Sequence, residues 1–165
     1  MKKQLYSVII IFLILFCCNF SYTLANPCID KFKSSDDINS KCNVQLAQVK
    51  RVVDGDTIHI YTGYQVIKVR LYGIDCMETS KIYRAYRQAY ENKTSIEDII
   101  KQGNFATSEL EKIIKENNNH VYFKTMGIDV SGRLLAILYD KNMTNINDKM
   151  LNTGYCPVYV FNKNK

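Results

Sequence analysis

The amino-acid sequence predicts a domain of the α+β class that is mainly β, a five-stranded barrel with about three helices packed on it. Three observations support this fold class. Short segments with alternating apolar residues recur, turns containing glycine separate them, and longer segments with helical spacing lie between and after them. The 165 residues are enough for one domain with a single core.

The first 25 residues have the features of a signal peptide. Two lysines precede a wholly apolar run at 8–16, and small residues lead to a cleavage point after Ala25. A membrane anchor is one alternative, but the run is shorter than the about 20 residues that a span needs. A lipid anchor on Cys17 or Cys18 is another, and the residues before these cysteines fit that processing poorly. We therefore expect residues 1–25 to be removed and the chain to be exported, secreted or periplasmic, without a stable membrane span.

The chain after the leader keeps four cysteines and a mild positive charge. Without the leader's two lysines, 20 Lys and Arg face 16 Asp and Glu, a net charge of +4 that suits a polyanionic partner. An even number of cysteines in an exported chain permits two disulfides. Cys28 with Cys42 is the favoured pair, because both lie in or beside a polar arm at 26–43, and their bridge would contribute about 3 kcal/mol. No CxxC or Cys/His spacing occurs, which argues against a zinc site.

Five segments have the alternation of apolar and polar residues that is typical of β-strands: 44–53, 57–61, 66–72, 121–125 and 133–139. In the third of them, Val69 and Leu71 share one face. Successive side chains of a strand point to opposite faces, so Arg70 is expected to point away from these two residues.

Two short helices are predicted after the third strand. Tyrosines at spacings of three and four predict a helix at 82–91. Thr94 with Glu97 resembles a capping box ahead of a second apolar group, and Gly103 is expected to terminate that helix.

The segment 104–117 is the strongest helix, because four apolar residues form a stripe along it. A last helix is predicted at 146–153, ended by Gly154 with a proline close behind. Strands and helices in this order suit a small barrel of the OB type, whose scant apolar interior requires the long helix to close one end.

Acidic residues cluster around the predicted hairpin. Asp54 and Asp56 flank Gly55, which is expected to adopt a left-handed turn, and Asp75 and Glu78 follow the third strand. Taken alone, Asp-Gly is a common hairpin signal, and an acid at a helix start is favoured by the helix dipole. Together, crowded carboxylates repel one another unless a cation binds, and oxygen-only ligands favour Ca²⁺ over zinc or copper.

Two arginines accompany these acids. Arg70 lies on the third strand, and Gly132 allows a turn that presents Arg133 at the start of the fifth. A solvated strand face is the alternative for Arg70. Guanidinium groups bind phosphate in a bidentate manner, so the combination predicts a site that holds and cleaves a phosphodiester.

Four motifs extend this prediction. VVDGDT, VRLYGIDCMET, DVSGR and NDKMLNTG followed by VYVF occur in that order and together resemble the staphylococcal (thermo)nuclease family. The resemblance covers about 44–161 and implies a domain at 44–165 with the OB fold. It implies a thermonuclease-like, Ca²⁺-dependent endonuclease that hydrolyses DNA and RNA, accepts single strands and leaves 3′-phosphate ends. A monomer is expected.

The resemblance also assigns roles by position. It implies calcium ligation by Asp56, Asp75 and the backbone carbonyl of Cys76, support from Asp54 and Thr57, a general base at Glu78, and phosphate binding by Arg70 and Arg133. Attack of water would then be driven by positioning and electrostatics.

The chain departs from the family pattern in the acidic segment. Cys76 and Met77 stand where the family has Thr-Pro, a change that a backbone ligand tolerates. A bond between Cys76 and Cys156 would tie the segment of the site to the last helix, and this pairing stays open beside free thiols.

A second departure concerns substrate binding. The segment after Glu78 is longer than in the prototype, and its Lys81, Arg84 and Arg87 lie among tyrosines, a mixture that suits single-stranded nucleic acid. The alternative is a solvated helix with a packing stripe of tyrosines. Tyr159 and Phe161 match the prototype's tail aromatics, so they are also candidate substrate contacts.

Two rival functions remain beside the nuclease. A catalytically inactive OB fold that binds nucleic acid or protein would not need the two arginines and Glu78, all of which are present. A metal-stabilised surface protein would need only the acids and leaves the arginines unexplained.

Overall fold

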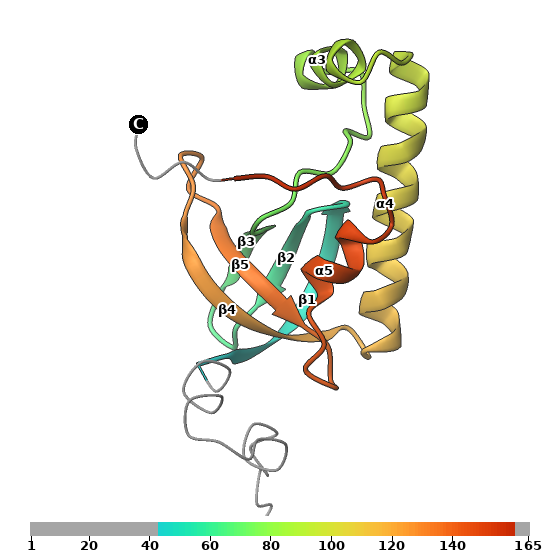
Figure 1. Cartoon of the computed structure of the whole chain (residues 1–165). Coiled ribbons are helices and arrows are strands. Elements are labelled where there is room, and N and C mark those ends of the chain that lie inside the picture. The colour runs from blue at the N-terminus through green and yellow to red at the C-terminus, as the bar shows by residue number, and fades with distance from the viewer. Residues whose placement is uncertain (1–42, 161–165) are drawn as a thin grey trace, which may run out of the picture. The chain divides into compact units, whose positions relative to one another are not determined.

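Alternating apolar side chains along five strands build a closed barrel (Figure 1). The computed structural model describes residues 43–160. The strands are β1 (Gln45–Asp54), β2 (Thr57–Tyr61), β3 (Val66–Leu71), β4 (His120–Ile128) and β5 (Leu134–Tyr139). They are hydrogen-bonded in the order β1-β2-β3-β5-β4, and β4 closes onto β1. The predicted five-stranded OB-type barrel is therefore confirmed.

The pairing of β3 with β5 is parallel, whereas the other pairs are antiparallel. In this register Arg70 lies opposite Leu135 and Val69 opposite Leu134. Arg133 comes directly before the start of β5, so the parallel register brings it to the same end of the barrel as Arg70. The topology thus joins two arginines that are far apart in the sequence.

Apolar residues from all five strands fill the barrel. Side chains that are fully buried include Ile58, Ile60, Val69, Leu71, Val121 and Leu138. Burying a side chain of this size stabilises the fold by about 1.5–3 kcal/mol. Arg70 and Thr57 are buried as well, although they are polar, and both lie at the end of the barrel that carries the acids.

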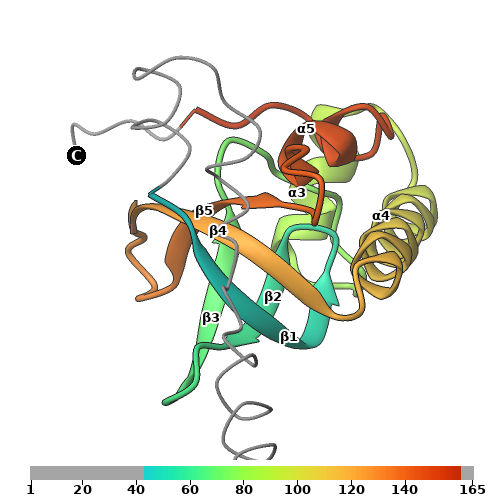
Figure 2. The ribbon, with the colours of Figure 1, turned by 90° about the horizontal axis from the view of Figure 1, so that it is seen from below.

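The structure has the predicted three helices: α3 (Tyr83–Glu91), α4 (Ile96–Glu116) and α5 (Ile146–Leu151). Helix α4 packs against β1 and α5 against β5, whereas α3 packs against α4. Helix α4 runs beside the barrel, with α5 next to it and α3 near its N-terminal end (Figures 1 and 2). Ala106, Leu110 and Ile114 of α4 join the barrel core. Ile99, in the first turn of α4, joins a second apolar cluster with Met77 and two alanines of α3.

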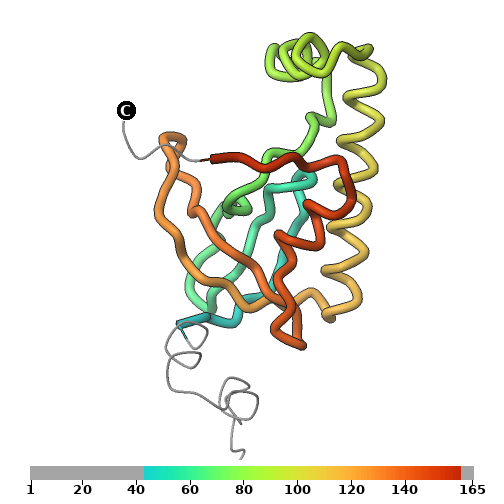
Figure 3. The backbone as a smooth tube through the Cα atoms, viewed as in Figure 1, coloured from blue at the N-terminus to red at the C-terminus, as the bar shows by residue number. Residues whose placement is uncertain are grey.

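The prediction that Gly103 ends a helix was wrong. Helix α4 runs through it without a break, as the tube in Figure 3 shows, and covers 21 residues. The capping residue is Ser95, whose hydroxyl accepts a hydrogen bond from the Asp98 N–H at 3.0 Å; the predicted cap Thr94 lies one residue earlier. A Cβ at position 103 would lie 2.4 Å from the backbone oxygen of Glu78, so glycine is needed for contact rather than for termination.

Several predictions fall on other parts of the chain. Four predicted features lie outside the described residues: the leader at 1–25, residues 26–42 of the polar arm, the Cys28–Cys42 bridge and Phe161. Between residues 43 and 160, no helix has the length and apolar character needed to cross a membrane.

Candidate active site

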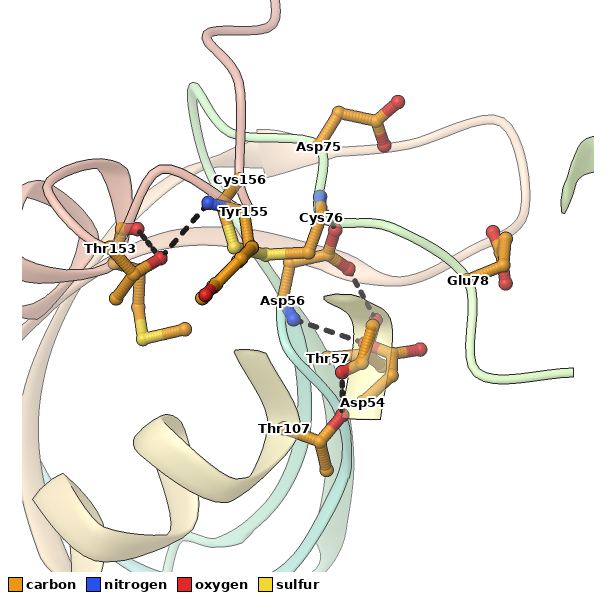
Figure 4. The surroundings of a disulfide bond; sticks show 12 residues. Asp54, Asp56, Thr57, Asp75, Cys76, Glu78, Thr107, Thr153, Tyr155 and Cys156 are labelled. Atoms are coloured by element: carbon orange, nitrogen blue, oxygen red, sulfur yellow. Dashed lines mark hydrogen bonds between the residues drawn. A yellow bond between two sulfur atoms is a disulfide. The ribbon is translucent and has the colours of Figure 1, made fainter. Parts of the chain in front are cut away.

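The turn between β1 and β2 carries the first two acids, and it points one of them into the protein. Asp56 is only 2% exposed. Its own N–H donates to Oδ1 of Asp54 at 3.1 Å, and the hydroxyl of Thr57 donates to its Oδ1 at 3.0 Å. Its Oδ2 accepts the N–H of Cys76 at 2.7 Å. The carboxylate of Asp56 therefore links the hairpin turn to the segment of the other two acids, as Figure 4 shows.

The glycine of this turn has a different purpose from the expected one. Gly55 does not adopt a left-handed conformation, so that prediction was wrong. A Cβ at this position would lie 2.7 Å from the Cβ of Ala106 on α4 and 3.0 Å from Sγ of Cys76. Gly55 is required because helix α4 and the disulfide approach the turn so closely.

Arg70 on β3 joins two of the carboxylates. The side chain is 7% exposed, and its Nη1 lies 2.6 Å from Oδ1 of Asp56. Its Nη2 contacts Oδ1 of Asp75. The alternative of a solvated strand face is thereby excluded, because this guanidinium is buried between Asp56 and Asp75.

The segment from Asp75 to Glu78 is tied to the C-terminal part of the chain. Cys76 forms a disulfide with Cys156, 80 residues away (Figure 4). The N–H groups of Asp75 and Met77 donate to the carbonyls of Pro157 at 3.0 Å and Tyr155 at 3.3 Å. The pairing that the sequence left open therefore anchors the acidic segment immediately after α5.

Gln88, which was not among the predicted site residues, holds the same segment from the other side. Its Nε2 donates to the carbonyl of Cys76 at 3.1 Å, and its Oε1 accepts the N–H of Glu78 at 3.0 Å. Gln88 is 5% exposed. A signal was present: Gln88 lies on the same helical face as Ala85 and Ala89, the small residues that α3 buries.

Arg133 is placed by a tight turn. Gly132 has a φ of +76°, which favours glycine, and confirms the expected turn. The carboxylate of Asp129 accepts the backbone N–H of Arg133 at 2.9 Å and its Nε–H at 2.7 Å. Arg133 directly precedes β5, whose parallel register with β3 puts it at the same end of the barrel as Arg70, and its positive charge opposes the rise in the pKa of Glu78.

Burial sets the protonation of the acids. It raises the pKa of Asp56 to about 6, with Arg70 opposing and Asp54 adding to the rise. Burial also raises the pKa of Glu78, Asp54 adds to this, and Arg70 and Arg133 oppose it. An acid with a raised pKa is a better proton acceptor near neutral pH, which suits a general base.

The inserted helix α3 brings one of the three predicted basic residues to the site. Nη2 of Arg84 contacts Oδ1 of Asp75, and its Nε lies 3.3 Å from Oε1 of Glu78. Lys81 instead pairs with Glu97 at 2.9 Å and Arg87 with Glu91 at 3.4 Å, so these two ion pairs lie on exposed surface. 

Of the two predicted tail aromatics, Tyr159 lies within the described residues, and it is 45% exposed. Its backbone N–H donates to the carbonyl of Gly73 at 2.9 Å, which places the tail beside the loop before Asp75.

The donors of the site fit a hard divalent cation. Asp56, Asp75 and the carbonyl of Cys76 offer only oxygen, the ligand type that Ca²⁺ and Mg²⁺ prefer. The carbonyl accepts one hydrogen bond, from Gln88, and a carbonyl has a second lone pair. Within residues 43–160, no three His, Cys, Asp or Glu side chains are gathered as a ready-made ligand set. Instead Arg70 lies between the two aspartates, so the acids are neutralised by arginine in this arrangement.

Comparison with known proteins gives two matches. The family described as "Staphylococcal nuclease homologue" matches residues 68–165, more than half of the chain. The chain is also 31% identical over 123 residues to the uncharacterized protein MJ1439 of Methanocaldococcus jannaschii. That alignment covers 70% of this chain and 59% of the relative, so the chain spans less than two thirds of the relative's length.

Proposed function

Since the chain belongs to the staphylococcal nuclease family, we propose that it is a Ca²⁺-dependent endonuclease that cleaves phosphodiester bonds of DNA and RNA. In this proposal the chain is exported after removal of its leader, acts as a monomer, and leaves 3′-phosphate ends. Single-stranded nucleic acid is an accepted substrate.

The proposal assigns one task to each group of residues. Asp56, Asp75 and the carbonyl of Cys76 would hold the cation, which supplies positive charge next to the phosphate when bound. Asp54 supports the turn through its hydrogen bond to the N–H of Asp56. Thr57 donates to the same aspartate.

Glu78 is the proton acceptor of this proposal. Its raised pKa brings it nearer to neutrality, where it can take a proton from an attacking water. Arg70 and Arg133 would bind the phosphate oxygens and stabilise the charge that develops on them. Because Arg70 is held by two aspartates and Arg133 by Asp129, both guanidiniums are already oriented before the substrate arrives.

One observation carries the proposal. Arg70 contacts both Asp56 and Asp75, although these acids belong to different loops, and the parallel pairing of β3 with β5 brings Arg133 from a third segment to the same end of the barrel. Holding three acids and two arginines at one end of the barrel has no evident benefit for folding, because a buried ion pair is weak evidence for stability. It does provide a site for a cation and a phosphate.

Exposed aromatic residues of α3 extend the proposal to substrate binding. Tyr83, Tyr86 and Tyr90 are 84%, 54% and 86% exposed and follow helical spacing. The packing-stripe alternative does not describe them, because the buried face of α3 is formed by Ala85, Gln88 and Ala89. The exposed tyrosines offer stacking surfaces for unpaired bases. Arg87 on the same helix and Lys81 just before it add positive charge.

The proposal is tested with purified chain lacking residues 1–25. It should cut single-stranded DNA or RNA with calcium and stop when a chelator is added. Arg133→Ala and Glu78→Ala should each lower kcat by at least about 10²–10³, the cost of losing one transition-state contact. Glu111→Gln, which changes a half-buried acid on α4 that pairs with Lys115, is the matched control and should cut normally. Near-normal turnover of a folded Arg133→Ala or Glu78→Ala variant contradicts the assignment. Retention of the strand without cutting favours a binding module instead.

A further inference from the structure

Arg84 is the feature of this site that the proposed roles leave unused. It lies on α3, next to Ala85 and one turn before Gln88, the residues by which the helix packs on the acidic segment. Its guanidinium contacts Asp75 through Nη2 and lies 3.3 Å from Glu78 through Nε. The helix therefore places a third arginine on a proposed metal ligand and on the proposed general base.

The contact at Asp75 is crowded. Oδ1 of Asp75 accepts contacts from both Arg70 and Arg84. A cation that used this carboxylate would meet two guanidiniums at the same oxygen, and like charges at such a distance repel strongly in a partly buried site. Arg84 and a divalent cation therefore compete for the charge of Asp75.

Arg84 is also incompletely satisfied where it lies. Its Nε is buried and has no hydrogen-bond partner among the described residues, because the geometry toward Glu78 is poor. Burial and the neighbouring charge of Arg70 lower the pKa of Arg84, and Arg87 and Arg133 act in the same direction. A guanidinium with a free donor among other positive charges gains from an anion such as a phosphate oxygen.

We propose that Arg84 competes with Ca²⁺ for Asp75, and that a bound phosphate removes this competition by taking Arg84 as its own ligand. Cation and nucleotide then bind cooperatively. A bound phosphate removes Arg84 from Asp75, which favours the cation, and a cation bound to Asp75 releases Arg84, which favours the phosphate. This inference rests on the proposed function, since it needs a cation and a phosphate at this site.

The test measures Ca²⁺ affinity by calorimetry, without nucleic acid and without turnover. Arg84→Gln should bind Ca²⁺ about tenfold more tightly than the unchanged chain, within the usual range of coupling between sites. Lys115→Gln is the control: it removes a positive charge from an exposed pair with Glu111 on α4, and should change the affinity by less than about twofold. Arg84→Lys keeps the charge and should stay within about threefold of the unchanged chain.

A second titration with thymidine 5′-monophosphate tests the exchange. The cation itself attracts phosphate, so some coupling is expected in every variant. The nucleotide should raise Ca²⁺ affinity by about tenfold more in the unchanged chain than in Arg84→Gln, and reciprocity requires the same factor for nucleotide affinity. Thermal unfolding of each variant establishes that it is folded.

The outcomes separate this inference from the proposed function. Equal or weaker Ca²⁺ binding by folded Arg84→Gln overturns the competition, as does the absence of Ca²⁺ binding in every variant. Equal coupling in both proteins overturns the exchange. Failure of the unchanged chain to cut nucleic acid overturns the proposed activity. The calcium titrations still decide, independently of cleavage, whether Arg84 competes with Ca²⁺.

Discussion

Replacing Gly103 by alanine should destabilise this protein, although the same change normally stabilises a helix by about 1 kcal/mol. The added Cβ would lie 2.4 Å from the oxygen of Glu78 and 2.5 Å from that of Met77, whereas ordinary contact begins at 3.4 Å. Helix α4 and the acidic segment must then separate by about 1 Å, because both neighbours are backbone atoms and cannot rotate away.

The magnitudes follow from this displacement. Overpacking costs about 1–3 kcal/mol, and backbone neighbours that cannot rotate away place this change in the upper part of that range, at about 2–3 kcal/mol. Subtracting the gain in helix propensity of about 1 kcal/mol leaves a net loss of about 1–2 kcal/mol. For a domain of this size the loss lowers Tm by about 3–8 °C. A shift of about 1 Å in Glu78 should also reduce kcat by up to about 10²-fold, because general-base catalysis depends on near-attack geometry.

Thermal unfolding by circular dichroism and the cleavage rate on single-stranded DNA measure the two effects. Asn104→Ala is the matched control, since it changes the next, exposed residue of the same helix and should shift Tm by about 2 °C or less. A higher Tm for Gly103→Ala, with unchanged cleavage, would refute the reasoning, because helix propensity alone would then decide the outcome.

Three further predictions concern the supports of the site. Gln88→Ala should lower the free energy of unfolding by about 1–3 kcal/mol and reduce kcat, because the carbonyl of Cys76 and the N–H of Glu78 lose their partner; urea unfolding that matches the unchanged chain would contradict this. Cys156→Ser removes a link between residues 80 positions apart and should cost about 2–5 kcal/mol, so a reducing agent should destabilise the unchanged chain by about that much more than it destabilises the variant, because the predicted Cys28–Cys42 bridge is reduced in both. Burial raises the pKa of Asp56 to about 6, so the folded protein holds a proton that the unfolded chain releases near pH 4. The stability from that proton is complete below about pH 4 and is lost as the pH rises through about 6. Relative to Asp56→Asn, the unchanged chain should therefore lose roughly 2–3 kcal/mol between pH 4 and pH 7 in urea titrations, and a constant difference would exclude the raised pKa.

The barrel could be predicted because its signals are local. Alternation along each strand determines which side chains face the core, and a slip by one residue would expose Ile58 or Val69 to water. The same holds for the acids of the hairpin, since Asp54 and Asp56 flank a turn and their separation in space follows from their separation in the chain. The order of the motifs then predicted the site residues around them, and the structure places Arg70 of the second motif against Asp56 and Asp75.

The two glycine predictions failed for a common reason. Gly55 and Gly103 were interpreted by backbone preference, as a left-handed turn and as a helix end. In the folded protein both are required by contacts with segments distant in the sequence: Gly55 with Ala106 and Cys76, and Gly103 with Met77 and Glu78. A glycine that makes room for a neighbour has no local signature.

The sequence by itself determined the strands, the part of the long helix that follows Gly103, and the identity of the acids and arginines, because alternation, helical spacing and motif order act over short distances along the chain. Only the tertiary structure decided which cysteine pairs with Cys76, that Gln88 clamps the acidic segment, and that Arg84 rather than Lys81 or Arg87 reaches Asp75. These choices depend on how α3, α4 and the C-terminal segment pack around one end of the barrel. Such packing is settled by distances between atoms far apart in the chain, which no local pattern of residues encodes.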